Sequence, residues 1–368
     1  GSKAYKSSIS APIIKIGIAA IAIGIVVMMI AIATGIGLQQ KIRDKVVAFN
    51  GHVIISNFDS NNSQESIFPV STKQDFYPTF KSVKGIKHIQ VVATKFGVIR
   101  TESDFEGVVL KGVGADYSWD YFKDFLVTGR LPDYTGKRNE EVLMSEYIAN
   151  RLKFKVGDTF QMIFGKDDPN KLPNIITYTI VGIYNSGFQD FDATYVIGDI
   201  RHIQRINNWD DDQVGNFEVF IDDFDQLQQK GIEIYQNTPS TFNTQTITEK
   251  YYSIFEWIKI FDKNIYGIIA IMILVAGINM ITALLVLILE RTQMIGILKA
   301  LGSNNWSIRK LFLYNASYLI MLGLFWGNII GLSLLYAQKQ FKLFPLDPSV
   351  YYVSEAPVYI VHTWIQRE

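Results

Sequence analysis

The 368-residue chain contains no cysteine, and only 19% of its residues are charged, against about 25% in an average soluble domain. The absence of cysteine excludes a disulfide scaffold, a cysteine zinc finger, an iron–sulfur site and a thioester-forming nucleophile. Basic and acidic residues are balanced at 35 each, so no overall basic field favours nucleic acid as a partner. The low fraction of charged residues therefore becomes informative through its distribution along the chain.

Motifs for nucleotide hydrolysis and for metal binding are also missing. Gly136-Lys137 and Gly165-Lys166 lack both the upstream glycine and the following Ser or Thr of a phosphate-binding loop. No G-x-S-x-G motif or H-E-x-x-H pair occurs. The four histidines are never at ligand spacing: His52, His88, His202 and His362. We therefore expect no catalytic residue, no metal site and no ATPase activity in this chain.

The missing charges are concentrated in three stretches without an ionisable side chain. They are 23, 26 and 27 residues long: Ile16–Leu38, Asn264–Leu289 and Leu311–Ala337. Each exceeds the roughly 20 residues that a helix needs to cross about 30 Å of hydrocarbon. We predict transmembrane helices at residues 16–38, 263–289 and 311–337. A signal peptide is the alternative for the first, but its apolar core is usually only about 7–15 residues long, which favours an uncleaved anchor.

The charges outside these stretches predict the topology. Residues 41–263 carry 25 basic and 31 acidic residues, a net charge of −6. The short flanks are basic instead, with Lys3, Lys6 and Lys15 before the first span and Arg291, Lys299, Arg309 and Lys310 in the loop at 290–310. Because short basic segments stay in the cytoplasm, residues 1–15 and 290–310 are expected inside, and residues 39–262 and the tail at 338–368 outside.

Residues 39–262 alternate apolar and polar side chains in several short runs bounded by turn-forming residues, which is typical of β-strands. We predict strands at Ile54–Ile55, His88–Ile99, Phe105–Val113, Phe160–Phe164, Ile175–Ile183 and Phe217–Ile221, and helices at Ser145–Leu152, Ile200–Ile206 and Asp223–Gly231. The fold class expected is therefore an α-helical membrane bundle with a large α+β domain inserted between spans one and two.

An apolar seam at helical spacing borders each end of this domain. The first consists of Leu38, Ile42, Val46 and Phe49, and the second of Ile247, Tyr251, Ile254, Ile258 and Phe261. Such spacing keeps one helix face against a neighbour. It predicts two helical stalks that continue the spans into the outer domain, and amphipathic helices lying on the domain core are the alternative.

Polar residues within the spans are few and uncharged, which argues against a transporter driven by protons or sodium. In the third span Gly323, Gly327 and Gly331 recur at every fourth position. Three bare backbone positions on one helix face permit close helix–helix approach. This pattern favours a packing face over a ligand groove.

The loop at 290–310 predicts a short helix with Met294, Ile297, Leu298 and Leu301 on its apolar side and Gly302 in the C′ position. Ser303 is expected to be the N-cap of a following helix that begins at Asn304. An exposed apolar helix in the cytoplasm favours a groove on a partner protein. The alternative is a surface helix that rests on lipid headgroups.

The segment E-R-T-x-x-I-G-I-L-K-A-L-G at 290–302, together with Ile308–Phe312 and the glycine-rich third span, resembles the permease subunits of type VII (FtsX/MacB-like) ABC transporters. These include lipoprotein-releasing permeases, the macrolide exporter and the cell-division permease. The motif L-D-P-x-x-Y-Y-x-x-x-x-P at 346–357, and the His52 strand after Lys41-x-Arg43-Asp44-Lys45, are most similar to the lipoprotein-releasing LolC/LolE-type branch of Bacteroidetes-type bacteria. The similarity extends over nearly the whole chain.

The resemblance implies a multi-pass protein of the bacterial inner membrane, with the large domain in the periplasm. It also implies a fourth span after Pro357, which is missing from Val358 to Glu368; because the chain also begins without Met, we expect both ends to be trimmed. The implied partners are a LolD-like ATPase that binds ATP and magnesium, a second permease copy or paralogue, lipoprotein cargo and a LolA-like chaperone. No cofactor is expected in this chain.

The residues that the resemblance assigns to ATPase coupling are Glu290, Arg291, Met294, Ile297, Leu298, Lys299, Leu301 and Gly302. At Met294 the family often has an acidic residue instead. The stalks are expected to transmit closure of the ATPase to the periplasm. A MacB-like drug or peptide exporter and an FtsX-like regulator of periplasmic hydrolases are the alternative functions.

Overall fold

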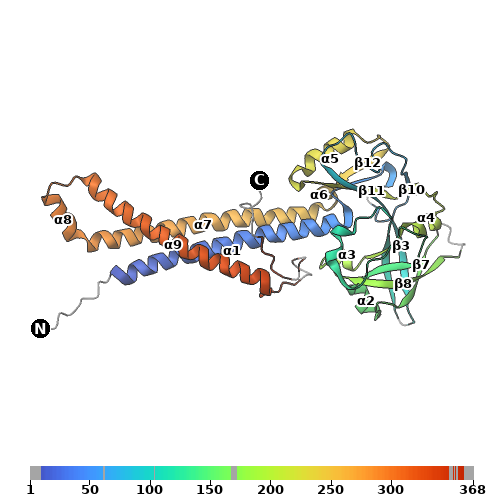
Figure 1. The fold of residues 1–368 in the computed structure, drawn as a ribbon, viewed down its shortest axis with the longest axis horizontal. Coiled ribbons are helices and arrows are strands. Elements are labelled where there is room, and N and C mark those ends of the chain that lie inside the picture. The colour runs from blue at the N-terminus through green and yellow to red at the C-terminus, as the bar shows by residue number, and fades with distance from the viewer. Residues whose placement is uncertain are drawn as a thin grey trace. The chain divides into compact units, whose positions relative to one another are not determined.

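The computed structural model describes residues 10–60, 63–102, 104–166, 172–347, 351, 353 and 355–359 (Figure 1). The chain divides into two compact units. We call residues 1–40, 256–346 and 355–368 the helical unit, and residues 41–255 and 347–354 the β-rich unit. The expected absence of a fourth span between Val358 and Glu368 falls almost entirely outside the described residues.

The helical unit is built from α1 (Ser10–Asn50), α7 (Tyr252–Glu290), α8 (Thr292–Ala300) and α9 (Asn305–Phe341). Within the described residues, three helices are long and apolar enough to cross a membrane, at Lys15–Asn50, Tyr252–Val286 and Asn305–Phe341. The full helices α1, α7 and α9 each contain one of the uncharged stretches and extend beyond it, because the apolar pattern continues into the flanking polar sequence. The last turns of α1 and the first turn of α7 belong to the β-rich unit.

Within the helical unit α7 lies alongside α1 in the antiparallel sense (Figure 1). Gly24 faces Met272, and Gly35 faces Ile265. The side-chain amide of Gln39 donates a hydrogen bond of 2.7 Å to the carboxylate of Asp262. After α9 the chain turns back, and the Tyr359 amide donates to the carbonyl of Ala33 in α1 at 3.0 Å.

The β-rich unit contains a ten-stranded mixed sheet, a separate two-stranded sheet and five helices among its described residues. The strands of the large sheet are β1 (Val53–Asn57), β3 (Ile86–Arg100), β4 (Phe105–Val113), β5 (Leu126–Gly129), β6 (Glu141–Ser145), β7 (Thr159–Phe164), β8 (Asn174–Tyr184), β9 (Tyr195–Asp199), β11 (Asn216–Ile221) and β12 (Phe242–Thr246). The small sheet pairs β2 (Val70–Ser71) with β10 (Gln213–Val214). The helices are α2 (Glu146–Leu152), α3 (Gln189–Asp192), α4 (Ile200–Asn207), α5 (Leu227–Gln236) and α6 (Ile247–Lys250). All six predicted strands and the predicted helices at Ser145–Leu152 and Ile200–Ile206 are confirmed. The helix predicted at Asp223–Gly231 begins as a 3-10 turn at Phe224–Gln226 and continues as α5.

The long strand β3 organises the sheet because it is shared by two sets of partners. Its first half pairs with β11 and its second half with β4 and β7. From β4 the pairing continues through β9, β6 and β8 to β7, which returns to β3 and closes a ring of strands. On the other side of β3, the sheet continues through β11 and β1 to β12. Along β8, buried and more exposed side chains alternate from Tyr178 to Tyr184, which is the period of a strand with one face on a core.

Three helices, α2, α4 and α6, start directly where a strand ends, because the last strand residue is an N-cap. The Ser145 hydroxyl accepts a hydrogen bond of 3.1 Å from the Ile148 amide at the start of α2. The Asp199 carboxylate accepts one of 2.9 Å from the Arg201 amide at the start of α4. A capping side chain satisfies one of the free N–H groups of a helix start, typically stabilising it by about 1 kcal/mol.

Candidate functional site

The first candidate site is the helical hairpin made by the end of α7, α8 and the start of α9. Helix α8 ends in a Schellman motif, in which the Ser303 amide donates to the Leu298 carbonyl at 2.9 Å and the Gly302 amide to the Lys299 carbonyl at 3.0 Å. Gly302 has a φ of +89°, which glycine adopts without steric cost. The prediction of Gly302 as the C′ residue of a short helix is therefore confirmed.

The predicted N-cap of the next helix is wrong by one residue. Asn304, not Ser303, accepts a hydrogen bond from the Ser307 amide at 2.8 Å, and α9 begins at Asn305. Ser303 directly follows the left-handed residue Gly302, and its amide bonds back to Leu298 to complete the end of α8. The start of α9 is therefore shifted by one residue, and Asn304 becomes its N-cap. The connection between the two helices is accordingly short, and each cap carries at least one hydrogen bond.

The hairpin displays apolar and basic side chains. Ile297 is 62% exposed and Leu301 77% exposed, and Arg291 and Lys299 of the same hairpin are exposed as well. The remaining predicted coupling residues are half-buried Met294 and Leu298 and exposed Gly302, while the side chain of Glu290 lies outside the described part of the chain. Large exposed apolar residues gathered on a helix are typical of an interaction surface.

The predicted packing glycines of α9 all face α1 in the helical unit. A Cβ atom at Gly323 would lie 2.6 Å from a methyl group of Ile21, and one at Gly327 would lie 3.0 Å from the Ala22 carbonyl oxygen. A Cβ atom at Gly331 would lie 2.9 Å from the Met29 sulfur. These separations are shorter than ordinary van der Waals contact, so α9 approaches α1 this closely only because glycine lacks a side chain.

The two predicted stalks have different structures. Leu38, Ile42, Val46 and Phe49 are all buried and lie on one continuous helix, α1. In the second seam, Ile247, Ile254 and Ile258 are buried and Tyr251 and Phe261 half-buried, but Ile247 belongs to α6 and the rest of the helical seam to α7. Tyr251 separates the two helices with φ −109° and ψ 43°. The second seam is therefore not the single helix that the periodicity predicts.

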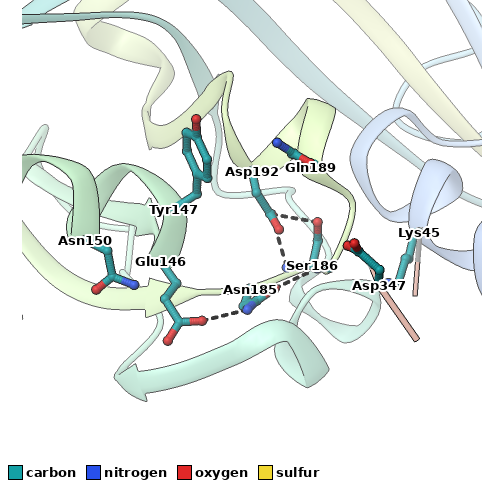
Figure 2. Close-up of a pocket in the computed structure, with 10 residues that line it drawn as sticks. Lys45, Glu146, Tyr147, Asn150, Asn185, Ser186, Gln189, Asp192 and Asp347 are labelled. Carbon is teal, nitrogen blue, oxygen red and sulfur yellow. Dashed lines mark hydrogen bonds between the residues drawn. The ribbon is translucent and has the colours of Figure 1, made fainter. Parts of the chain in front are cut away.

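A polar cavity of about 480 Å³ lies in the β-rich unit (Figure 2). Its lining comes from α1, α2, the loop before α3, α3 itself and the segment after α9: Lys45, Glu146, Tyr147, Asn150, Asn185, Ser186, Gly187, Gln189, Asp192 and Asp347. Figure 2 shows Lys45 beside Asp347, which belongs to the L-D-P motif singled out in the sequence. The cavity thus joins one ammonium group and three carboxylates from distant parts of the chain.

Asp192 is the most buried carboxylate of this cavity, at 6% exposure. It accepts hydrogen bonds from the Ser186 hydroxyl at 2.6 Å and the Ser186 amide at 3.1 Å. Burial raises the pKa of Asp192, although these hydrogen bonds and the charge of Lys45 oppose the rise. Sequence reasoning identified none of these lining residues as a site, because they are scattered singly among loops and helices. Within the described residues no cluster of acidic and histidine side chains could hold a metal ion.

Two family models match the chain. The MacB-like periplasmic core domain matches residues 16–234, and the C-terminal domain of FtsX-like permeases matches residues 266–364. The first covers more than half of the chain. The chain therefore belongs to the FtsX/MacB-like family of ABC transporter permeases, which confirms the resemblance drawn from its motifs.

Individual curated relatives share only about a fifth to a quarter of their aligned residues with this chain. The chain is 20% identical to the lipoprotein-releasing system transmembrane protein LolC of Haemophilus influenzae, over 84% of this chain and 75% of LolC. It is also 20% identical to LolE of the same organism, over 89% of this chain and 79% of LolE. The ABC transporter permease YtrF of Bacillus subtilis is 27% identical over 43% of this chain and 37% of YtrF.

Proposed function

We propose that this chain is the permease subunit of an ABC transporter that releases lipoproteins from the bacterial inner membrane and passes them to a periplasmic LolA-like chaperone. The observation that carries this proposal is the alignment with LolC and LolE over most of the chain. The L-D-P-x-x-Y-Y motif at 346–352 supports the same branch. In this proposal the chain is a multi-pass protein with the β-rich unit in the periplasm, and its second permease subunit is another copy or a paralogue.

Coupling to a separate LolD-like ATPase is assigned to α8. The basic residues around α8 favour a cytoplasmic position for it. Its exposed apolar residues Ile297 and Leu301 fit a hydrophobic groove on a partner, and Arg291 and Lys299 fit an acidic rim around it. The ATPase then binds ATP and magnesium, and the permease transmits its movement through α1 and α7 to the β-rich unit.

The substitution Ala300→Pro tests the coupling assignment. Proline in the last turn of α8 removes a backbone N–H and clashes with the preceding turn, at a cost of about 3 kcal/mol. We expect the variant to insert into membranes but to lose co-purification with the ATPase. Gln293→Ala, at an exposed position of the same helix, is the matched control. Normal recovery of the ATPase with the proline variant would mean that it binds elsewhere.

Reconstitution tests the transport function itself. The chain, its partner permease and the ATPase are placed in proteoliposomes with radiolabelled triacylated lipoprotein, and ATP-dependent transfer to soluble chaperone is measured. We expect transfer only with ATP and all subunits present. ATP-dependent export of a drug or peptide without lipoprotein transfer would contradict the proposal and favour the exporter alternative. ATP-dependent activation of a periplasmic hydrolase would instead favour the FtsX-like regulator.

A further inference from the structure

A buried ion pair lies where α1 enters the β-rich unit. Lys111 of β4 and Glu218 of β11 are each 3% exposed at their side chains, and the Lys111 Nζ lies 2.5 Å from the Glu218 carboxylate. The same ammonium group donates a hydrogen bond to the backbone carbonyl of Phe49 in the last turn of α1. Carbonyls at a helix C-terminus have no partner within the helix and carry the negative end of its dipole. Lys111 therefore caps the end of α1 with a positive charge.

Further hydrogen bonds hold this pair in one geometry. The Gln90 side-chain amide donates to the second Glu218 oxygen at 2.8 Å, and its own oxygen accepts from the Ser118 backbone amide at 3.0 Å. Gln90 lies on β3, between the strands that carry Glu218 and Lys111. The end of α1 is bonded directly to Lys111 of β4, and through Lys111 it is linked to Glu218 of β11 and Gln90 of β3.

Stability alone does not account for a charged pair at this place. Replacing a buried ion pair by apolar residues of similar volume is often neutral or stabilising, because taking two charges out of water is costly. An apolar pair could not bond to the Phe49 carbonyl. The specific contribution of Lys111 and Glu218 is therefore a directional tie between the helix end and the sheet.

The side chain of Phe49 reinforces this tie. Its ring is 2% exposed. Five aromatic rings lie around it, with centroid distances of 4.7 to 6.3 Å: Phe122, Phe125, Tyr184, Phe191 and Tyr195. Backbone and side chain of one residue thus fix both the direction and the rotation of α1 about its axis.

We propose that Lys111 and Glu218 are positioning residues that make α1 and the sheet one rigid body, so that movement of α1 turns the β-rich unit. This inference deepens the proposed transport function and depends on it for its consequence in transport. The rigidity itself is a property of the β-rich unit and can be measured without any cargo.

Electron spin resonance can measure the rigidity. Because the chain has no cysteine, Lys41→Cys on α1 and Thr159→Cys at the start of β7 introduce the only thiols, and both positions are exposed. Distances between spin labels at these positions are measured in the full complex with its ATPase, without nucleotide and with ATP. We expect one narrow distance distribution that is the same in both states.

The double substitution Lys111→Met/Glu218→Leu removes the ion pair and the hydrogen bond to the Phe49 carbonyl, and it places apolar side chains of similar size at both positions. We expect its label distances to broaden and the ATP hydrolysed per lipoprotein released to rise several-fold. The matched control is Lys95→Met/Glu65→Gln, which removes an ion pair between β3 and the loop before β2. The control should leave the label distances and the ATP consumption unchanged.

Narrow, unchanged label distances in the Lys111→Met/Glu218→Leu variant would overturn the proposal. A label distance that changes with nucleotide in the labelled chain that keeps Lys111 and Glu218 would overturn it as well. If this variant fails to fold, Lys111→Gln/Glu218→Gln supplies the same test, because the side chain at 111 becomes shorter and neutral. If the wild-type complex releases no lipoprotein, the proposed function fails, whereas the label distances still decide whether the joint is rigid.

Discussion

The two helices that connect the units, α1 and α7, meet the β-rich unit in different ways. Helix α1 runs without a break for 41 residues, and its last turn is bonded to the sheet through Lys111 and surrounded by aromatic rings. Helix α7 begins only after the break at Tyr251, which separates it from α6. The Tyr251 hydroxyl donates one hydrogen bond of 2.8 Å to the Asn50 side chain. From the Lys111 hydrogen bond at the end of α1 and the helix break at Tyr251, we expect a rigid arm at α1 and a jointed arm at α7.

The largest expected effect comes from breaking the rigid side with the single substitution Lys111→Met. It leaves the buried Glu218 charge without its partner, and loss of one member of a buried pair costs about 3–5 kcal/mol. We expect a corresponding loss in the free energy of unfolding, measured by amide hydrogen exchange of β11 in the full chain in detergent. The double variant Lys111→Met/Glu218→Leu should recover most of it. A single variant as stable as the wild type would show that Glu218 is not held as a buried charge.

Acid should weaken the same side of the molecule through His52, which follows α1 directly. Its Nδ1 accepts a hydrogen bond of 3.2 Å from the Ile221 amide, so the ring is neutral in the fold. Burial, with a smaller contribution from the charge of Lys87, lowers the pKa of His52 from 6.5 to about 4. Because the folded pKa lies below the unfolded one, the stabilisation is complete above pH 6.5 and is lost as the pH falls towards 4. The loss at low pH is about 3 kcal/mol.

Hydrogen exchange of β11 between pH 7 and pH 4, corrected for intrinsic rates, measures this loss. His52→Gln should flatten the pH dependence. Burial also lowers the pKa of His202 in α4, so His202→Gln is the matched comparison that separates the two contributions. An unchanged slope in His52→Gln would rule out titration at the end of α1.

The two arms also differ within the helical unit, and glycine substitutions can sharpen this contrast. A Cβ at Gly327 of α9 meets the Ala22 carbonyl of α1 at 3.0 Å, whereas a Cβ at Gly277 of α7 meets nothing within 4 Å. Gly327→Leu should therefore destabilise the helix packing by about 1–3 kcal/mol, and Gly277→Leu by much less. Thermal unfolding of the purified full chain in detergent compares the two variants. Equal losses would mean that α7 is as closely packed as α1.

Local sequence patterns predicted those parts of the fold that depend on local physics. The uncharged stretches, the strands with period two and the glycine that ends α8 were all readable in this way. The strands β2, β5, β6, β9, β10 and β12 were missed; each has five residues or fewer, which leaves little alternation to detect, although β1, also of five residues, was predicted from its Ile54-Ile55 pair. The pairing of β7 with β3, which closes the ring of strands, was also missed. Neither strand carries a sequence signal for a partner so distant in the chain.

The joint at the end of α1 was missed for a related reason. Lys111 and Glu218 are each a charged residue between apolar neighbours in a strand. Because apolar and polar side chains alternate along a half-buried strand, the pattern predicts that such a charged residue faces solvent. The two residues are 107 positions apart in the sequence, so only the fold reveals that they pair and are both buried. The T-x-x-E capping box at Thr246–Glu249 marks the start of α6. It does not mark the break at Tyr251, which contains neither glycine nor proline and so has no signal in the sequence.

The smallest expected effect tests the jointed side. Tyr251→Phe removes only the hydroxyl that donates to Asn50, and a hydrogen bond of this kind contributes about 1 kcal/mol. If α7 is tied to the end of α1 mainly by this bond, amides in the first turn of α7 should exchange about fivefold faster, which is the factor that 1 kcal/mol represents. Amides in the last turn of α1 should keep their protection, because Lys111 and the ring of Phe49 still hold that turn. Tyr235→Phe, at a side chain that is 61% exposed, is the control. Equal loss of protection in α1 and α7 would show that both helices form one joint, and the distinction between a rigid arm and a jointed arm would have to be abandoned.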